Sequence, residues 1–363
     1  MTTIHSGSGS PSTHFSVPDG RTATEPPEHR GLTRDGVRLL IADRHGVEHS
    51  QFSRLDEFLS AGDLLLVNTS ATVAAELDAH QSGGWPAVVH FATELDDATW
   101  VVELRRAPDG DRPILYADSG DVILLNHGVR IQLIEPYPGP RDPGSSASPT
   151  GRGTRLWRAM ILSAGRMADY LERYGRPISY GYLRDRWPLE DYQTIFAREP
   201  GSAEMASAAR PFTPELVVRL ITKGILLAPI TLHTGVSSQQ AGEPPQAERF
   251  TVPASTARLV NHTRAHGGRV IAVGTTATRA IESALDPEGV VHATTGWTTL
   301  VLGPNRAVRV VDGLITGWHD PEASHLLLVE SVVGARTSQL AYEAAVANGY
   351  LWHEFGDAGL LLR

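Results

Sequence analysis

The chain has 363 residues, of which 41% are hydrophobic and 20% are charged, so it is long enough for one large core or for two domains. A net charge of −9 argues against a surface coated in positive charge for nonspecific nucleic-acid binding, and a local basic groove stays compatible with it. Because the chain has no cysteine, disulfides, thiolate metal sites and cysteine nucleophiles are excluded together.

Neither a membrane span nor an export signal is indicated by the sequence. No apolar run approaches the roughly 18–20 residues needed to cross a bilayer, and the polar N-terminus lacks the apolar stretch of a signal peptide. We therefore expect a cytoplasmic protein that uses no metal and has no membrane partner. A monomer is the default oligomeric state.

The N-terminal region begins with a polar tail and continues with short apolar runs. Residues 1–14 are rich in Ser, Gly and Thr, which predicts disorder. Strands are predicted over 37–42 and 63–68, and a short helix over 55–59. The second strand is continuously apolar, as expected for a strand buried on both faces of a sheet.

A different pattern, short apolar runs between turn residues without a convincing helix, extends over residues 77–157. It predicts a small β-barrel or sandwich. Its strands are expected at 86–91, 100–104, 121–125 and 129–134, and residues 138–153 have the composition of a flexible loop.

After residue 157, helices and strands alternate. One helix should begin at Thr213, as N-cap, with Pro214 in the first turn, and should stop at Gly224. Pro229 suggests that its strand lies at a sheet edge or a bulge. Further helices are predicted over 164–174, 254–266, 323–333 and 339–348, with strands over 225–232 and 269–273 and near Leu300 and Val308. We expect an α/β main domain, residues 15–76 and 158–363, interrupted by the inserted barrel.

The segment 268–283, GRVIAVGTTATRAIES, is the most informative one in the chain. A β-branched strand ends at a turn, Gly274-Thr275-Thr276, and good helix formers follow. Ligands of α/β proteins bind at the carboxyl ends of strands, where helix N-termini present free N–H groups. The alternative is that Thr275 or Thr276 merely caps the helix.

Two histidines are candidates for proton transfer. His233 follows a predicted strand directly, and His319 lies just before an apolar helix. The alternative for each is a hydrogen-bonded structural residue, which is the commoner case. His319 and His325 flank Asp320, but their spacing matches no strong metal motif and a proline interrupts the helical arrangement, so we predict no metal site.

Other polar and aromatic residues could contact a ligand. Glu204 and Arg210 lie in a segment of small residues that permits close backbone approach, or they form a surface salt bridge in a tight loop. Trp297, Trp318 and Trp352 belong to the core or face a cationic ligand. The motifs of dinucleotide, ATP, serine-hydrolase and zincin sites are not present.

Six blocks of sequence, in this order, resemble the QueA family of S-adenosylmethionine:tRNA ribosyltransferase-isomerases over residues 15–362. They are GDLLLVNT at 62–69, YQTIFA with EPGS at 192–202, TLHTG at 231–235, the segment 268–283, VVDGLITGWH at 310–319 and FGDA at 355–358. The resemblance implies a three-layer α/β/α domain with an inserted small β-barrel domain.

The resemblance also implies a reaction and its partners. S-adenosylmethionine is the ribosyl donor substrate, and 7-aminomethyl-7-deazaguanine in tRNA is the acceptor. The product is epoxyqueuosine, with adenine and methionine released. His233 is the first candidate for acid/base work and His319 the second. The residues expected to bind substrate are Gly274, Thr275, Thr276, Ser207, Arg210, Phe212, Gly235, Asp312, Trp318 and Ser324.

The chain departs from the family pattern at several positions. Ala71 and Glu76 replace basic residues, which predicts weaker phosphate contacts. Ser207, Ala209 and Pro211 replace Thr, Gly and His. Two alternatives therefore stay open: an S-adenosylmethionine-using enzyme with another acceptor, such as a small molecule, and a non-catalytic nucleoside-binding or RNA-binding module.

Overall fold

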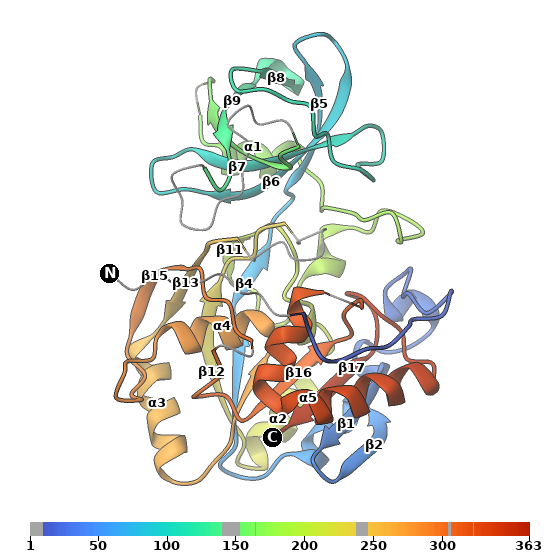
Figure 1. The fold of residues 1–363 in the computed structure, drawn as a ribbon, viewed down its shortest axis with the longest axis vertical. Coiled ribbons are helices and arrows are strands. Elements are labelled where there is room, and N and C mark those ends of the chain that lie inside the picture. Colours follow the sequence, from blue (N-terminus) through green and yellow to red (C-terminus); the bar gives the residue numbers. More distant parts are fainter. Residues whose placement is uncertain (1–9, 140–152, 164, 237–245, 304–305, 322) are drawn as a thin grey trace.

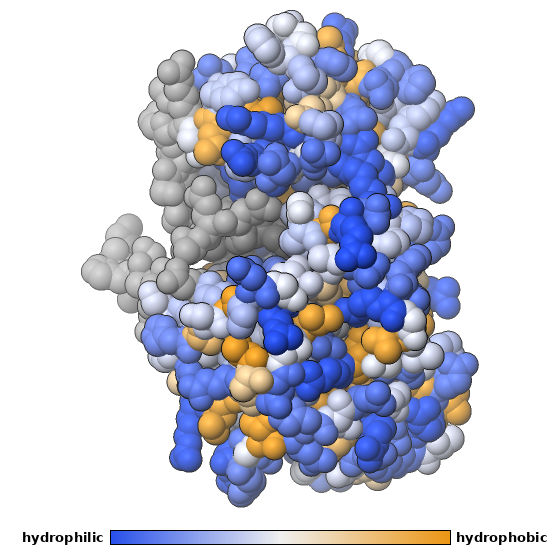
Figure 2. All heavy atoms as spheres, turned by 90° about the vertical axis from the view of Figure 1, so that its right-hand side faces the viewer, coloured by the Kyte–Doolittle hydropathy of each residue, from blue (hydrophilic) through white to orange (hydrophobic). Residues whose placement is uncertain are grey.

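A computed structural model describes residues 10–139, 153–163, 165–236, 246–303, 306–321 and 323–363, and it consists of a β-barrel above a larger α/β domain (Figure 1). Hydrophilic and hydrophobic residues are interspersed over the face of both parts in Figure 2. No helix within the described residues is long and apolar enough to span a membrane.

The α/β domain is built on a nine-stranded sheet whose central strands are parallel. Successive residues of the central strand Leu64–Asn68 point to opposite faces, as strand geometry requires. In spatial order the strands are β15 (Thr294–Thr298), β13 (Glu248–Val252), β12 (Leu226–Leu232), β3 (Leu64–Asn68), β14 (Val270–Val273), β16 (Gly313–Gly317), β17 (Ala358–Leu362), β1 (Arg38–Asp43) and β2 (Gly46–Gln51).

Helices cover both faces of this sheet. Leu64 and Leu66 pack in one core with α3 (Ala254–Ala265), α4 (Thr275–Ser283) and α5 (Ser324–Ala347). Leu65 and Val67 pack in a second core, on the opposite face, with α2 (Pro214–Thr222) and η3 (Phe52–Phe58). The predicted three-layer α/β/α architecture is confirmed.

The barrel is closed and antiparallel, and its own core is separate from those of the sheet. α1 (Met167–Tyr174) follows the last strand and adds Met167 and Leu171 to the barrel core. The strands are β5 (Glu76–Gln81), β6 (Pro86–Glu94), β7 (Trp100–Arg106), β8 (Val122–Leu125), β9 (Arg130–Pro136) and β10 (Leu156–Ile161). The remaining short elements are η1 (Pro27–Arg30), η2 (Arg34–Gly36), β4 (Ser70–Thr72), η4 (Asn126–Gly128), η5 (Leu189–Tyr192), β11 (Glu199–Ser202) and η6 (Ser207–Ala209).

Some expected elements differ in the structure. The strand expected near Leu300 is β15, which ends at Thr298, whereas Val308 lies in no strand because its side chain is buried in the core without joining a ladder. By contrast, the two helices expected after residue 323 are confirmed, because α5 consists of two helical parts separated at Gly334, whose φ of +81° and ψ of 154° are not helical. Pro229 lies in an interior strand, and β12 pairs with β13 only from Thr231 onward, so the missing N–H interrupts no ladder on that side.

The last residues of the N-terminal tail are ordered, although disorder was expected there. Thr13 is buried, and its hydroxyl donates to Glu330 at 2.7 Å, so the expectation of disorder up to residue 14 is wrong there. Residues 1–9 of that tail, and residues 140–152 of the expected loop at 138–153, lie outside the described residues.

The start of α2 has the predicted cap, since Thr213 Oγ1 accepts a hydrogen bond from the Leu216 N–H at 3.2 Å. Thr213→Ala should lower the free energy of unfolding by about 1 kcal/mol, because that N–H group loses its partner. Thr222→Ala, an exposed threonine in the last turn of the same helix, is the matched control. Urea unfolding of both variants is the measurement, and equal stability of the two would contradict the prediction.

Candidate functional site

Asn68, at the carboxyl end of β3, connects the elements that surround the candidate site. Its side chain is fully buried. Its Nδ2 donates to the Leu232 carbonyl at 2.9 Å, and its Oδ1 accepts from the N–H groups of Leu232 and Ser70, both at 3.0 Å. The Nδ2 atom also lies 3.4 Å from Thr276 Oγ1. One amide therefore joins the ends of β3 and β12 to the start of α4.

The turn before α4 is built on a glycine. Gly274 has φ of +94°, and a Cβ atom placed there would lie 3.4 Å from the Cβ of Ala208. Gly274 occupies the N-cap position without a side-chain hydrogen bond, and α4 starts at Thr275. The interpretation that Thr275 or Thr276 only caps the helix is therefore wrong.

Both threonines line a cavity of about 750 Å³ that opens to solvent. Gly235 and Ser324 line it too, so four of the residues expected to bind substrate share one cavity. Its charged and titratable lining residues are Glu204, Glu248, Arg279 and His325.

Arg279 forms an ion pair inside the cavity wall. Its guanidinium is almost fully buried, pairs with Glu248 and donates to the Leu300 carbonyl at 3.0 Å. Burial raises the pKa of Glu248, although Arg279 acts in the opposite direction. We interpret Arg279 as the residue that holds the cavity wall on β13 and α4 together.

His325 lines the cavity, and the sequence analysis considered it only as a metal ligand. The ring of His325 stacks on the ring of His319, with centroids 4.6 Å apart. His319 Nε2 in turn lies 3.1 Å from Thr316 Oγ1. Burial, and secondarily Arg279, lowers the pKa of His325 to about 4, and burial holds the pKa of His319 well below its usual value. Both rings are therefore neutral near pH 7 and can accept a proton. The position of His325 in the first turn of an apolar helix was the sequence feature that could have indicated a ligand site.

His233 is half-buried and precedes two lining residues, Thr234 and Gly235, without itself lining the cavity. Its Nδ1 is 2.7 Å from Ser70 Oγ, which is 2.6 Å from Ser202 Oγ. Gly201 packs against the ring so closely that a Cβ there would lie 2.6 Å from Nδ1. Burial, and secondarily Arg249, lowers the pKa of His233, so a proton transfer would have to use Nε2 of a neutral ring.

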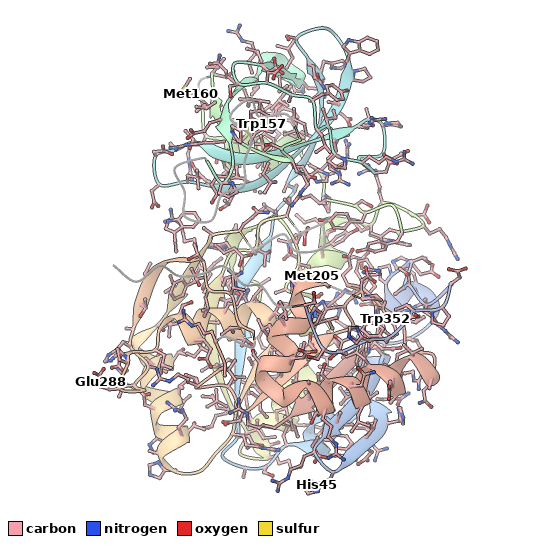
Figure 3. All side chains as sticks on the ribbon, in the orientation of Figure 1. His45, Trp157, Met160, Met205, Glu288 and Trp352 are labelled. Atoms are coloured by element: carbon pink, nitrogen blue, oxygen red, sulfur yellow. The ribbon has the colours of Figure 1, made fainter. Side chains whose placement is uncertain are left out.

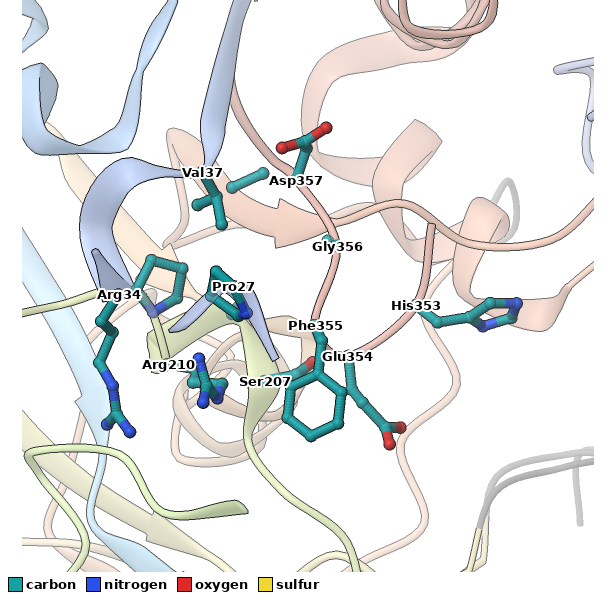
Figure 4. A pocket seen from close by; sticks show the side chains of 14 residues that line it. Pro27, Arg34, Val37, Ser207, Arg210, His353, Glu354, Phe355, Gly356 and Asp357 are labelled. Carbon is teal, nitrogen blue, oxygen red and sulfur yellow. The ribbon is translucent and has the colours of Figure 1, made fainter. Parts of the chain in front are cut away.

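A smaller cavity of about 340 Å³ lies beside the loop before β17 (Figure 4), and Ser207 and Arg210 line it. Arg210 is 2% exposed and pairs with Glu28 at 3.1 Å and Asp191 at 3.4 Å. The alternative of a surface salt bridge does not hold for Arg210, because this residue is buried and pairs with other carboxylates. Glu204 accepts a hydrogen bond from Tyr180 instead.

Three residues expected to bind substrate lie elsewhere. Phe212 is fully buried and packs edge-on against Phe52 and Phe196. Trp318 is 2% exposed among the rings of Tyr342, Tyr350 and Trp352. Asp312 accepts a hydrogen bond from the Val270 N–H at the amino end of β14, whereas the larger cavity lies at the carboxyl end of that strand. Phe212 and Trp318 thus pack in the core, and Asp312 pairs with backbone where β14 begins, so none of the three lines either cavity.

Glu76 also has another role than expected. Its carboxylate is fully buried and accepts from His90 at 3.0 Å and from Arg176 at 2.6 Å. This carboxylate faces no solvent, so it does not itself repel a phosphate, and the weaker phosphate contacts expected from the loss of two basic residues stay a prediction. Within the described residues no group of three or more His, Asp or Glu side chains could hold a metal ion.

Comparison with known proteins places the whole chain in one group. A family model described as queuosine biosynthesis protein matches residues 11–361. An S-adenosylmethionine:tRNA ribosyltransferase-isomerase from Thermus thermophilus is 35% identical over 342 residues, covering 91% of this chain and 93% of that protein. One from Sorangium cellulosum is 33% identical and covers 96% of each chain. The crystal structure of S-adenosylmethionine tRNA ribosyltransferase from Thermotoga maritima matches with a TM-score of 0.51 at 26% identity, covering 96% of this chain and 99% of that chain.

The buried amide of Asn68 generates a stability prediction. Asn68→Ala removes hydrogen bonds from three buried backbone groups of Leu232 and Ser70, so the free energy of unfolding should fall by about 3 kcal/mol. Asn126→Ala, an exposed asparagine of the barrel, should change it by less than about 0.5 kcal/mol. Urea unfolding and hydrogen exchange of the Leu232 amide measure the effect. An Asn68→Ala protein as stable as the control would contradict this role.

Proposed function

This chain belongs to the queuosine biosynthesis protein family, and we propose that it transfers and isomerises the ribosyl group of S-adenosylmethionine onto 7-aminomethyl-7-deazaguanine in tRNA. The observation that carries the proposal is the match to ribosyltransferase-isomerases over at least 91% of the chain. A match of that extent includes the barrel as well as the α/β domain.

In this proposal S-adenosylmethionine binds in the larger cavity. The first turn of α4 offers the hydroxyls of Thr275 and Thr276 and free backbone N–H groups, which suit the methionine carboxylate or the nucleoside hydroxyls. The carboxylate of Glu204 in the same wall suits the positive sulfonium. The cavity opens to solvent, so a ligand can reach these groups from outside.

The chemistry requires a base, because the sulfonium acidifies the neighbouring C5′ protons and one of them must be removed before the amine attacks the sugar. Neutral histidines supply such a base. We propose His233 for this role, since Thr234 and Gly235, which follow it, line the cavity. The alternative is the stacked pair of His319, the second candidate from the sequence, and His325, which lines the cavity.

The proposed activity is tested with S-adenosylmethionine and tRNA carrying 7-aminomethyl-7-deazaguanine. We expect adenine release and epoxyqueuosine in the digested nucleosides, identified by mass spectrometry. A folded protein that binds S-adenosylmethionine and yet forms no modified nucleoside would refute the proposal. Turnover with the free base alone would instead support a small-molecule acceptor.

The role of His233 is tested by His233→Gln, which should lower turnover by at least about a hundredfold because the proton acceptor is lost. His45→Gln, an exposed histidine at the far end of the α/β domain (Figure 3), should leave turnover unchanged. If the His233→Gln protein retains full activity, His233 is not the base, and His325→Gln becomes the variant that should lose turnover.

A further inference from the structure

A ladder of three near-parallel aromatic rings lies next to the smaller cavity. The rings of Tyr180 and Tyr182 have centroids 6.0 Å apart with an interplanar angle of 21°. Tyr182 stacks on His353 at 4.3 Å and 13°. The tyrosines come from the segment that follows the barrel, whereas His353 comes from the loop before β17, so the ladder forms only in the folded protein. Proteins bind unpaired RNA bases by stacking them on aromatic side chains of this kind.

Each tyrosine of the ladder donates a hydrogen bond to a carboxylate. Tyr180 donates to Glu204, which lines the larger cavity, and Tyr182 donates to Glu354 Oε2 at 2.7 Å. Glu354 lines the smaller cavity, and it projects from the same loop as His353 (Figure 4). The two carboxylates thus connect the walls of the two cavities through the tyrosines.

One carboxylate oxygen of Glu354 lacks a hydrogen-bond partner among the described residues. Its Oε1 atom is buried, and none of the described residues forms a hydrogen bond with it. A buried acceptor without a partner costs free energy unless a ligand satisfies it. A ligand that donates hydrogen bonds and carries positive charge would satisfy Oε1 and would be attracted by the adjacent ring faces. A primary ammonium group has both properties.

The charge state of Glu354 suits proton transfer near neutral pH. Burial raises its pKa to about 7, and the nearby Glu204 carboxylate also raises it, whereas the Tyr182 hydrogen bond and the Arg210 charge lower it. Burial lowers the pKa of His353, whose Nε2 lies 3.6 Å from Asp320. A base with a pKa close to the working pH transfers protons most effectively.

We propose that Glu354 is the base that deprotonates the aminomethyl group of the acceptor nucleotide while the nucleotide stacks on the Tyr180–Tyr182–His353 ladder. This inference rests on the proposed function. The acceptor amine arrives as an ammonium ion, one N–H bond breaks, and the proton forms an O–H bond with Oε1. The electron pair stays on the nitrogen, which then attacks the ribosyl group, while that group's bonds to adenine and to the methionine sulfur break and release adenine and methionine over the reaction. No redox partner is involved.

Glu354→Gln tests the inference, with Glu288→Gln, an exposed and distant glutamate, as the matched control. With wild type, turnover at saturating substrates should fall by about tenfold per pH unit below about pH 7. Glu354→Gln should lose at least about a hundredfold at pH 8 and should lose this acid limb. Binding of S-adenosylmethionine without tRNA should be unchanged in both variants, which also reports that they are folded.

Tyr182→Phe gives an independent readout. Removal of its hydrogen bond to the ionised carboxylate should raise the pKa of Glu354, so the acid limb should move to higher pH while turnover on the alkaline side persists. Wild-type turnover together with an unchanged limb in Glu354→Gln would overturn the inference and leave the proposed function standing. Absence of turnover by the wild type, with S-adenosylmethionine bound, would overturn both.

Discussion

The site depends on a side-chain amide that continues a backbone ladder. β3 and β12 pair in parallel up to Asn68 and Ile230, and β12 then turns to pair with β13. Where the strands part, Asn68 bonds both the N–H and the C=O of Leu232, so the sheet opens without leaving buried backbone groups unpaired. This opening lets Ser70, Ser202 and His233 meet beside the larger cavity.

The electrostatics of the two cavities share one theme. Each cavity is lined by a buried arginine whose charge is neutralised by ion pairs. Arg279 pairs with Glu248, and Arg210 pairs with Glu28 and Asp191. Carboxylates and neutral histidines then remain as the groups able to act on a ligand. Burial raises the pKa of these carboxylates and lowers that of the histidines, so it disfavours the charged form of each group.

The fold followed from the sequence where periodicity and turn chemistry acted locally. The continuous apolar run of β3, the cap at Thr213 and the alternating runs of the barrel each indicated their element correctly. Apolar character alone was ambiguous near Val308, since core packing outside a ladder requires the same residues as a strand. Gly334 is a local signal that worked, because this glycine adopts a non-helical conformation and separates the two helical parts of α5.

The sequence by itself determined the family, the three layers and the strand–turn–helix at Gly274, since these rest on local order along the chain. The tertiary structure decided which polar residues share a cavity. Thr276, Gly235 and Ser324 come together, whereas Asp312 lies at the amino end of β14 and Trp318 in the core. Tyr182 and Glu354 meet across 172 positions of sequence. Their contact depends on how the segment after the barrel packs against the loop before β17, which no local pattern encodes.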